Sequence, residues 1–296
     1  MTVAHLAQPG ILAPIPSHAR YLSLQLRVGA DPTTALRRLA TQADGDETVV
    51  AIGPSLVRVL GKEIPGLREF RGIDGARVKL PSTPVDLLLW LRGSERGELL
   101  LRSRHLETLL APSFEVVYIT DAIRHGDGRD LTGYKNQAER LVGESAAEAA
   151  MLPSTAGVLA GSCFATAMRW HHRLSRFEAM SRSQQDHTFG RERDTGEAIP
   201  DAPPSAHANR VNHRSFSPPA VLLRRSMPYV DGNEGGFAFA CFAPSFDPFE
   251  RLLTRMTGAE DGIVDALFSF SEPRTTAYLW CPPVKEGWMD FSALGI

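Results

Sequence analysis

Residues 21–52 read "YLSLQLRVGADPTTALRRLATQADGDETVVAI", and this stretch decides which fold we expect. Apolar residues alternate with polar ones from Leu22 to Val28, which predicts a strand with one buried face. Asp31 is a good N-cap, and the proline after it suits a first helical turn, so a helix follows over residues 31–43. The apolar run at residues 48–52 predicts a second strand, which gives the order strand, helix, strand.

The remainder of the chain extends this order into two similar halves. The first half continues with a predicted strand at 85–91, a helix at 96–111 and a strand at 114–123. The resulting order, strand-helix-strand-strand-helix-strand, is that of a ferredoxin-like domain. The second half predicts the same order in segments 162–171, 173–189, 220–227, 236–243, 247–258 and 275–281.

We therefore predict an α+β protein made of tandem ferredoxin-like domains, with antiparallel β-sheets and flanking helices. The N-terminal domain is predicted at residues 1–145 and the C-terminal domain at residues 146–296. The long polar segment at 190–219 lies between a predicted helix and the next strand. Segments of that length without regular structure are usually functional or disordered.

Composition and missing motifs exclude several classes of protein. The 296 residues are 43% hydrophobic with a net charge of −2, which suits a globular protein and gives no support for nucleic-acid binding. No apolar run reaches the roughly 20 residues that span a bilayer. The N-terminal residues lack the basic start of a signal peptide, so we expect a cytoplasmic protein without a membrane partner. The motifs of phosphate loops, dinucleotide-binding folds, zinc proteases and serine hydrolases do not occur.

A few polar residues stand out as candidates for a functional site. His207 lies in the Pro-rich "DAPPSAHANRVN", where a stiff backbone suits presentation to a cofactor; an uninvolved loop histidine is the alternative. Arg224 and Arg225 interrupt an apolar strand, so one of them faces inward and needs either an anionic ligand or a structural partner. Asp265 lies among apolar residues and suits either a cap or a hydrogen bond to a buried histidine.

Other histidines and the cysteines suggest no site. His171 and His172 are neighbours on a predicted strand, so they point to opposite sides, and we expect a surface pair at the strand end. The three cysteines, Cys163, Cys241 and Cys281, form no C-x-x-C motif, which favours a reducing compartment over a disulfide framework.

Several motifs, in order along the chain, give a stronger indication. They are "QPGILAPIPSHARYL", "GPSLV", "DLTGY", "SAH", "RRSMP", and "DGIVDALF" followed by "YLWCPP". With these motifs the sequence resembles, almost end to end, the dye-decolourising peroxidases of the bacterial cytoplasmic P or B type. The resemblance implies a tandem ferredoxin-like fold, in agreement with the strand and helix pattern. It also implies that the C-terminal domain binds haem b (iron protoporphyrin IX).

The resemblance further implies roles for individual residues. His207 stands where the family has the proximal ligand to the haem iron, and Asp265 where it has the acidic partner of that histidine. Arg224 corresponds to the distal arginine, and Ser226 to a distal position at which many members carry Asn. Arg191 is a further residue that we expect to bind the cofactor.

The chain departs from the family on the distal side. Members typically read G-[FY]-x-D-G-T-x-N-P, whereas this chain has "GYKNQAERL" from Gly133 to Leu141, so Asn136 replaces the distal aspartate. An amide holds water or peroxide but cannot act as the general base that moves a proton. Arg224 stays protonated and suits stabilisation of the departing oxygen. We therefore predict a haem-dependent peroxidase that reduces hydrogen peroxide and oxidises dyes, phenolics or similar one-electron donors, slowed by Asn136.

Two other functions stay open at this point. The altered loop also suits a haem enzyme recruited to a biosynthetic oxidation, or a haem-binding protein without turnover. By analogy with the family we expect a homo-oligomer. The C-terminal "MDFSALGI" shows no extension typical of a cargo tag, and the sequence leaves enclosure by a shell protein open.

Overall fold

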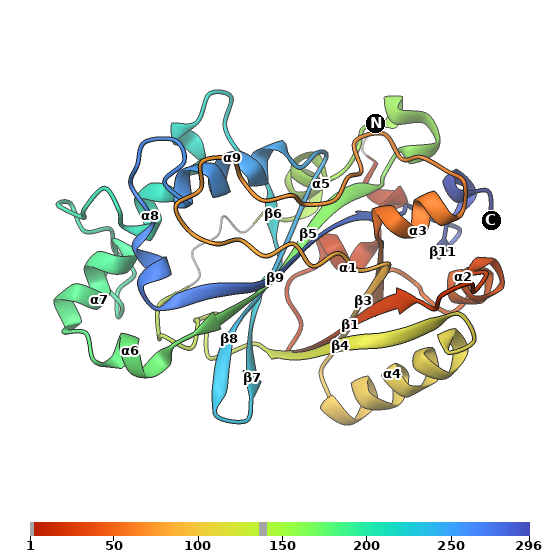
Figure 1. Ribbon diagram of the computed structural model, residues 1–296, viewed down its shortest axis with the longest axis horizontal. Coiled ribbons are helices and arrows are strands. Elements are labelled where there is room, and N and C mark those ends of the chain that lie inside the picture. Colours follow the sequence, from red (N-terminus) through yellow and green to blue (C-terminus); the bar gives the residue numbers. More distant parts are fainter. Residues whose placement is uncertain (1–2, 136–140) are drawn as a thin grey trace.

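A nine-stranded antiparallel sheet organises the chain. The computed structural model describes residues 3–135 and 141–296. The strand order is β5-β9-β2-β3-β1-β4-β7-β8-β6, and β5 also pairs with β8, so the sheet closes into a ring (Figure 1). The strands of this sheet are β1 (His18–Leu26), β2 (Thr48–Ile52), β3 (Leu87–Gly93), β4 (Phe114–Ile123), β5 (Cys163–His172), β6 (Leu223–Arg224), β7 (Met227–Asp231), β8 (Glu234–Ala243) and β9 (Ser271–Cys281).

The first half of the ring has the predicted ferredoxin-like order. Its strands pair as β2-β3-β1-β4, with every neighbour antiparallel. α2 (Thr33–Ala40) and α4 (Arg96–Leu110) lie together beside this half, at the lower right of Figure 1. The bounds predicted for β2 and β4 are those observed. β1 ends earlier than predicted, at Leu26, whose backbone N–H donates to Asp86 Oδ2 at 2.7 Å, and Val28 is exposed instead of buried.

The second half repeats the order as β9-β5-β8-β7, and β6 pairs with the far end of β8. The helix predicted at 173–189 is two helices, α6 (Leu174–Glu178) and α7 (Arg182–Phe189). Ser181 starts the second helix with a capping box, which explains the break. The strand predicted at 220–227 is likewise divided into β6 and β7, and Arg225 and Ser226 lie between them.

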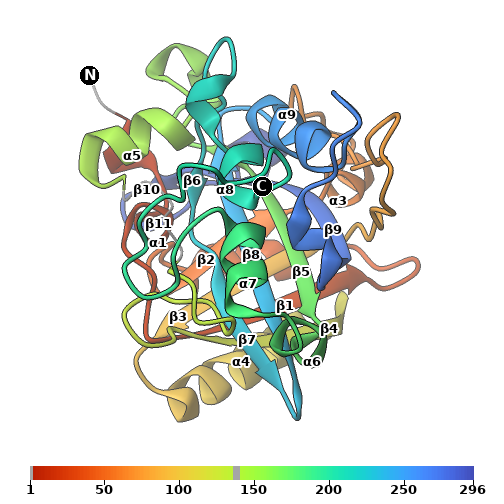
Figure 2. The ribbon, with the colours of Figure 1, turned by 90° about the vertical axis from the view of Figure 1, so that its left-hand side faces the viewer.

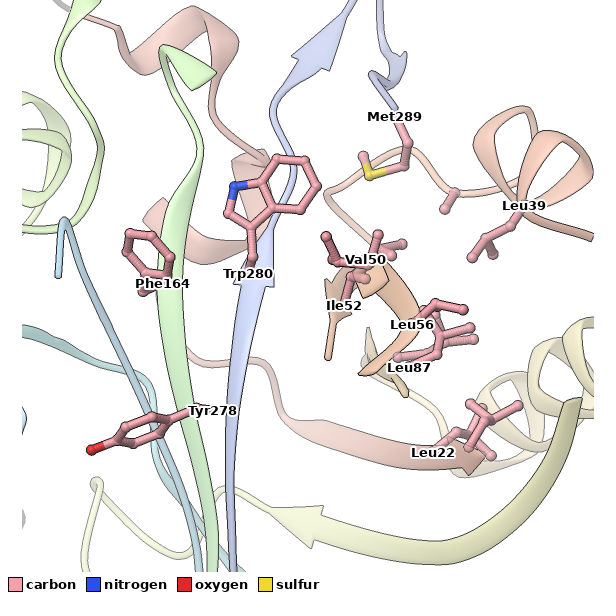
Figure 3. Packing of buried hydrophobic residues seen from close by; sticks show 14 of the residues in the cluster. Leu22, Leu39, Val50, Ile52, Leu56, Leu87, Phe164, Tyr278, Trp280 and Met289 are labelled. Atoms are coloured by element: carbon pink, nitrogen blue, oxygen red, sulfur yellow. The ribbon is translucent and has the colours of Figure 1, made fainter. Parts of the chain in front are cut away.

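Alternation along the strands fills two cores on opposite faces of the sheet. The face that carries α2, α4 and α9 (Asp247–Met256) buries residues of both halves, among them Leu22 and Trp280 (Figure 3). The opposite face buries Tyr21, Trp90 and Phe242, whose rings stack at centroid distances of 5.9 and 6.1 Å. Because β1 to β5, β8 and β9 each contribute to both cores, the closed sheet holds the two halves together.

The two halves meet at both edges of their sheets. Ile52 pairs with Trp280, and Ala122 pairs with Tyr229. α5 (Gly143–Ala150) belongs to the connection between the halves, and the predicted domain boundary between residues 145 and 146 stays a prediction. Within residues 3–135 and 141–296, no helix has the length and apolar character needed to cross a membrane.

Candidate active site

A cavity of about 600 Å³ lies between the second half of the sheet and the segments that cover it. Met168 of β5, Arg224 of β6 and Phe239 of β8 line its sheet side, Phe249 of α9 lines a further wall, and His207 lies on the covering segment. Figure 2 looks onto α7 and α8 (His207–Arg210), which belong to that covering segment. The cavity volume is within the roughly 300–1,000 Å³ of small-molecule and cofactor sites.

His207 and Asp265 are joined by a hydrogen bond at the edge of this cavity. The Nδ1 atom of His207 lies 2.8 Å from Oδ2 of Asp265, whose side chain is fully buried. The other oxygen, Oδ1, accepts the N–H of Leu267 at 2.8 Å, so Asp265 is both a cap and a histidine partner. A carboxylate only accepts, so Nδ1 of a neutral His207 carries the proton and Nε2 keeps its lone pair for a ligand in the cavity.

Backbone contacts fix the position of this pair. The N–H of Ala266 donates to the carbonyl oxygen of Ser205 at 2.7 Å, which joins the segments of Asp265 and His207. Gly190 ends α7 with a φ of 74°, and a Cβ atom there would lie 3.0 Å from Cβ of Ala206. A glycine is needed at this position because it adopts the left-handed conformation and lets the helix end approach the histidine segment.

Arg224 and Arg225 have different surroundings. Arg225 is buried, and within the described residues its guanidinium donates to backbone carbonyl oxygens alone, those of Ile11, Leu12, Leu141 and Arg224. In this part of the chain its partner is therefore the backbone rather than an acidic side chain. Burial lowers the pKa of Arg225 to about 10, and the nearby Arg92 cation acts in the same direction.

Arg224 lines the cavity instead. Among the residues that the structure describes, its guanidinium makes no hydrogen bond and no ion pair. Burial lowers the pKa of this guanidinium below its ordinary value, with Cys241 opposing the change, but an arginine remains a cation at any ordinary pH. Arg224 thus presents a partly desolvated positive charge to whatever occupies the cavity.

Ser226 faces a second cavity of about 490 Å³, which shares Arg224 and Phe237 with the first. The hydroxyl of Ser226 accepts the N–H of Ala240 at 3.1 Å and donates to the carbonyl oxygen of the same residue at 3.3 Å. Both contacts are with the backbone of β8, so this hydroxyl is already engaged. The distal role implied for Ser226 stays a prediction.

The last two predicted site residues are Arg191 and Asn136. Arg191 lines the larger cavity, and its Nη1 atom donates to the carbonyl oxygen of Gly196 at 3.2 Å. Asn136 lies outside the described residues, so its role as the replaced distal residue stays a prediction. The structure therefore brings His207, Arg224 and Arg191 to one cavity, with Asp265 bonded behind His207.

Sequence reasoning missed one polar array in the cavity wall. The surface position expected for His172 is wrong: this residue is buried at the end of β5, with Nε2 3.2 Å from Oδ1 of Asp130 and Nδ1 2.7 Å from Oγ of Ser271. All three residues line the cavity. Alternation along a strand places His172 on the same face as the buried Trp170, and this signal was present in the sequence.

The charge of Asp130 follows from its partners. Burial by itself would raise the pKa of Asp130, but the hydrogen bond and charge of His172, together with the Thr132 hydroxyl, lower it on balance. The Thr132 hydroxyl donates to Oδ2 of Asp130 at 2.7 Å. Asp130 is therefore a carboxylate at neutral pH.

Comparison with known families shows which family the chain belongs to. A family model described as "Dyp-type peroxidase, C-terminal" matches residues 127–286, which is more than half of the chain. The chain belongs to the DyP-type peroxidase family. The family predicted from the sequence motifs is thus confirmed, and with it a peroxidase function, that of an oxidoreductase acting on peroxide.

Individual DyP-type proteins are similar to this chain over most of their length. A dye-decolorizing peroxidase of Brevibacterium linens is 26% identical over 292 residues, which cover 92% of this chain and 79% of that protein. The crystal structure of a dye-decolorizing peroxidase from Bacteroides thetaiotaomicron has a TM-score of 0.84 at 21% identity and covers 95% of this chain and 97% of that chain. A variant of Rhodococcus jostii RHA1 DypB in complex with heme has a TM-score of 0.81 at 21% identity, with the same coverage. These similarities confirm the predicted fold of two ferredoxin-like halves.

The residues of the larger cavity fit a haem group. No three His, Cys, Asp or Glu side chains of the described residues are arranged to hold an ion. Of the three histidines that line the cavity, His207 is the one whose Nδ1 is bonded to Asp265, which leaves its Nε2 for a ligand. A single imidazole suits an iron atom whose in-plane ligands come from a porphyrin. Apolar side chains such as Phe249 suit the ring, and the cations Lys135, Arg191 and Arg214, which line the same cavity, suit its carboxylates.

Proposed function

We propose that this DyP-type protein binds haem b in the larger cavity, reduces hydrogen peroxide and oxidises dyes, phenolics or similar small one-electron donors. The observation that carries the proposal is the His207–Asp265 hydrogen bond of 2.8 Å at a cavity of cofactor size. When bound, haem supplies the redox chemistry that splits the peroxide O–O bond and takes electrons from the donor.

His207 is the residue that we assign as the iron ligand. Its Nδ1 proton is held by the buried Asp265, which fixes the tautomer and directs the Nε2 lone pair away from that carboxylate. Carboxylate–imidazole pairs of this kind also increase the basicity of the ligating nitrogen. Asp265 therefore acts through His207 as a positioning residue.

Arg224 is the residue that we assign to stabilise negative charge on the departing peroxide oxygen. It lines the cavity, it stays a cation, and in the described part of the chain its guanidinium has no competing partner. A fixed cation in a partly desolvated site stabilises developing charge without reorganisation. Arg191 is assigned to bind a haem carboxylate from the same cavity.

Asn136 sets the expected rate. Its amide can hold a water molecule or peroxide by hydrogen bonds but cannot take up a proton, so the proton transfer that an aspartate performs in the family is weakened. We expect a slowed peroxidase rather than an inactive one, because Arg224 is retained.

The test is peroxide-dependent oxidation of a phenolic donor by the haem-loaded protein. Arg224→Leu is expected to lower the rate by about 100-fold. The control Arg176→Leu, which changes an exposed arginine on α6, is expected to leave it unchanged. Asn136→Asp is expected to raise the rate by about 10- to 100-fold. Equal rates in the wild type and Arg224→Leu, with haem bound in both, would contradict the assignment of Arg224.

A further inference from the structure

Asp130, His172 and Ser271 form a continuous hydrogen-bonded array in the cavity wall. The imidazole of His172 lies between the Asp130 carboxylate, 3.2 Å from Nε2, and the Ser271 hydroxyl, 2.7 Å from Nδ1. The three residues come from distant parts of the chain, namely the loop after β4, the end of β5 and the start of β9. Both ends of the array, Asp130 and Ser271, line the same cavity as His207 and Arg224.

The chemistry of the partners fixes the form of the imidazole. A carboxylate cannot donate, so a neutral His172 carries its proton on Nε2, facing Asp130. Nδ1 is then the acceptor, and the Ser271 hydroxyl donates to it. A buried Asp–His–Ser array in this form can take up one proton, because the carboxylate stabilises the imidazolium that results.

Other cavity-lining groups are weaker candidates for the same task. Among the described residues, two carboxylates line the cavity, and the second, Glu192, is exposed and accepts the hydroxyl of Thr195. Tyr134 donates its phenol proton to Asp186, and burial together with that carboxylate raises the pKa of Tyr134, so it is no base at neutral pH.

We propose that Asp130, His172 and Ser271 are a proton relay for the cavity, which performs proton transfer in place of the missing distal aspartate. The inference rests on the proposed haem peroxidase function. In the relay, the Ser271 hydroxyl passes its proton to Nδ1 of His172 and takes one from an oxygen of bound peroxide. The reverse transfer returns that proton to the oxygen that leaves as water, so the array ends unchanged, and the cofactor alone supplies electrons.

Ser271 is buried at the start of β9 and also lines the cavity, so its hydroxyl is placed to exchange a proton there. A purely structural role is the remaining alternative, because Asp130 also holds the turn at Thr132 and His172 fixes that turn to the sheet. The two roles differ in what they predict for Ser271.

The relay is tested with the binding of hydrogen cyanide to the ferric, haem-loaded protein, a reaction in which the ligand must lose its proton. His172→Gln and Ser271→Ala are each expected to slow cyanide binding by about 100-fold. The matched controls Glu192→Gln and His213→Gln change the other carboxylate and another histidine of the cavity, and are expected to leave the rate unchanged. A structural role predicts instead that Ser271→Ala, which keeps the Asp130–His172 contact, has the wild-type rate.

A readout without haem completes the test. In the haem-free protein, ¹⁵N NMR is expected to show that the neutral imidazole of His172 carries its proton on Nε2 and none on Nδ1. A neutral imidazole with its proton on Nδ1, or wild-type cyanide rates in both His172→Gln and Ser271→Ala with haem bound, would overturn the relay while leaving the proposed function intact. Failure of the wild-type protein to bind haem would overturn the proposed function and the relay together.

Discussion

Asp265 divides its two carboxylate oxygens between a backbone N–H and the imidazole of His207, 58 residues earlier in the chain. One oxygen fixes the short helix that begins at Ala266, and the other fixes the tautomer of the histidine. Because the same carboxylate does both, the local fold and the ligand geometry depend on one buried side chain.

Asp265→Asn is expected to weaken haem binding by about 10- to 100-fold. The amide can still accept the N–H of Leu267, but its NH₂ group donates to Nδ1 of His207 and drives the proton to Nε2, the atom needed for the iron. Haem titration followed by absorption measures the change. Asp261→Asn is the matched control, since Asp261 pairs with Arg210 and not with the histidine. Equal haem affinity in Asp265→Asn and the wild type would contradict this account.

Substitution of Arg225 is expected to lower the stability of the protein, whereas substitution of Arg224 is expected to leave its stability nearly unchanged. Arg225→Met leaves several buried carbonyl oxygens without a donor and is expected to lower the free energy of unfolding by about 2 to 4 kcal/mol. Arg224→Met removes no side-chain hydrogen bond or ion pair within the described residues and is expected to change that energy by less than about 0.5 kcal/mol.

Urea unfolding of the haem-free variants measures both effects. The two changes are similar in chemistry and adjacent in sequence, so each serves as the control for the other. A larger loss of stability for Arg224→Met than for Arg225→Met would contradict the assignment of the two side chains.

Adjacent arginines also show where the sequence stops being informative. The alternation rule predicts that one of the pair faces inward, and Arg225 is buried, but it lies between β6 and β7 and not on the predicted strand. The rule could not identify the partner of Arg225, because the carbonyl oxygens of residues 11, 12 and 141 are brought together by the tertiary fold. The same limit applies to Asp130 and Ser271, which meet His172 from a loop and a strand far away in the sequence.

Local patterns predicted the presence of the helices and strands better than the residues at which these begin and end. β2 and β4 have the predicted bounds because their apolar patterns start and stop sharply. The break at Ser181 was missed, although its capping residue Gln184 follows at the expected spacing, because the apolar spacing alone favoured one long helix. The roles proposed for His207 and Arg224 come from the family motifs, because no local pattern distinguishes these residues from structural ones.

Protonation of Asp261 is expected to lower the stability of the folded protein at acidic pH. The hydrogen bonds from Arg210 hold the pKa of Asp261 at about 2, against an ordinary value near 3.9 in an unfolded chain. A lowered folded pKa contributes stability that is present above about pH 4 and is lost as the pH falls through about 2.

Urea midpoints of the haem-free wild type and Asp261→Asn measure this contribution. The wild type is expected to exceed the variant by a constant amount between pH 7 and about pH 5, and the gap is expected to shrink below about pH 4. A gap that stays constant down to about pH 2 would show that Asp261 does not titrate between the folded and unfolded states as stated.

The three cysteines are expected to be unreactive in the folded protein. Cys163, Cys241 and Cys281 are all buried, and burial raises the pKa of Cys241 to about 12 in spite of the hydrogen bonds from Thr166. Thiolates are the reactive form, so a thiol reagent at pH 8 is expected to label none of the three within the time that labels all of them in urea. Rapid labelling of one cysteine in the native protein would show that its strand opens.

A haem titration of the wild type, His207→Ala and His213→Ala, followed by absorption and by rescue with free imidazole, tests whether His207 binds the iron. We expect the wild type and His213→Ala to bind one haem with the spectrum of imidazole ligation. We expect His207→Ala to lose this spectrum and to regain it when imidazole is added. Retention of the wild-type spectrum and affinity in His207→Ala would contradict the claim that His207 is the ligand to the iron.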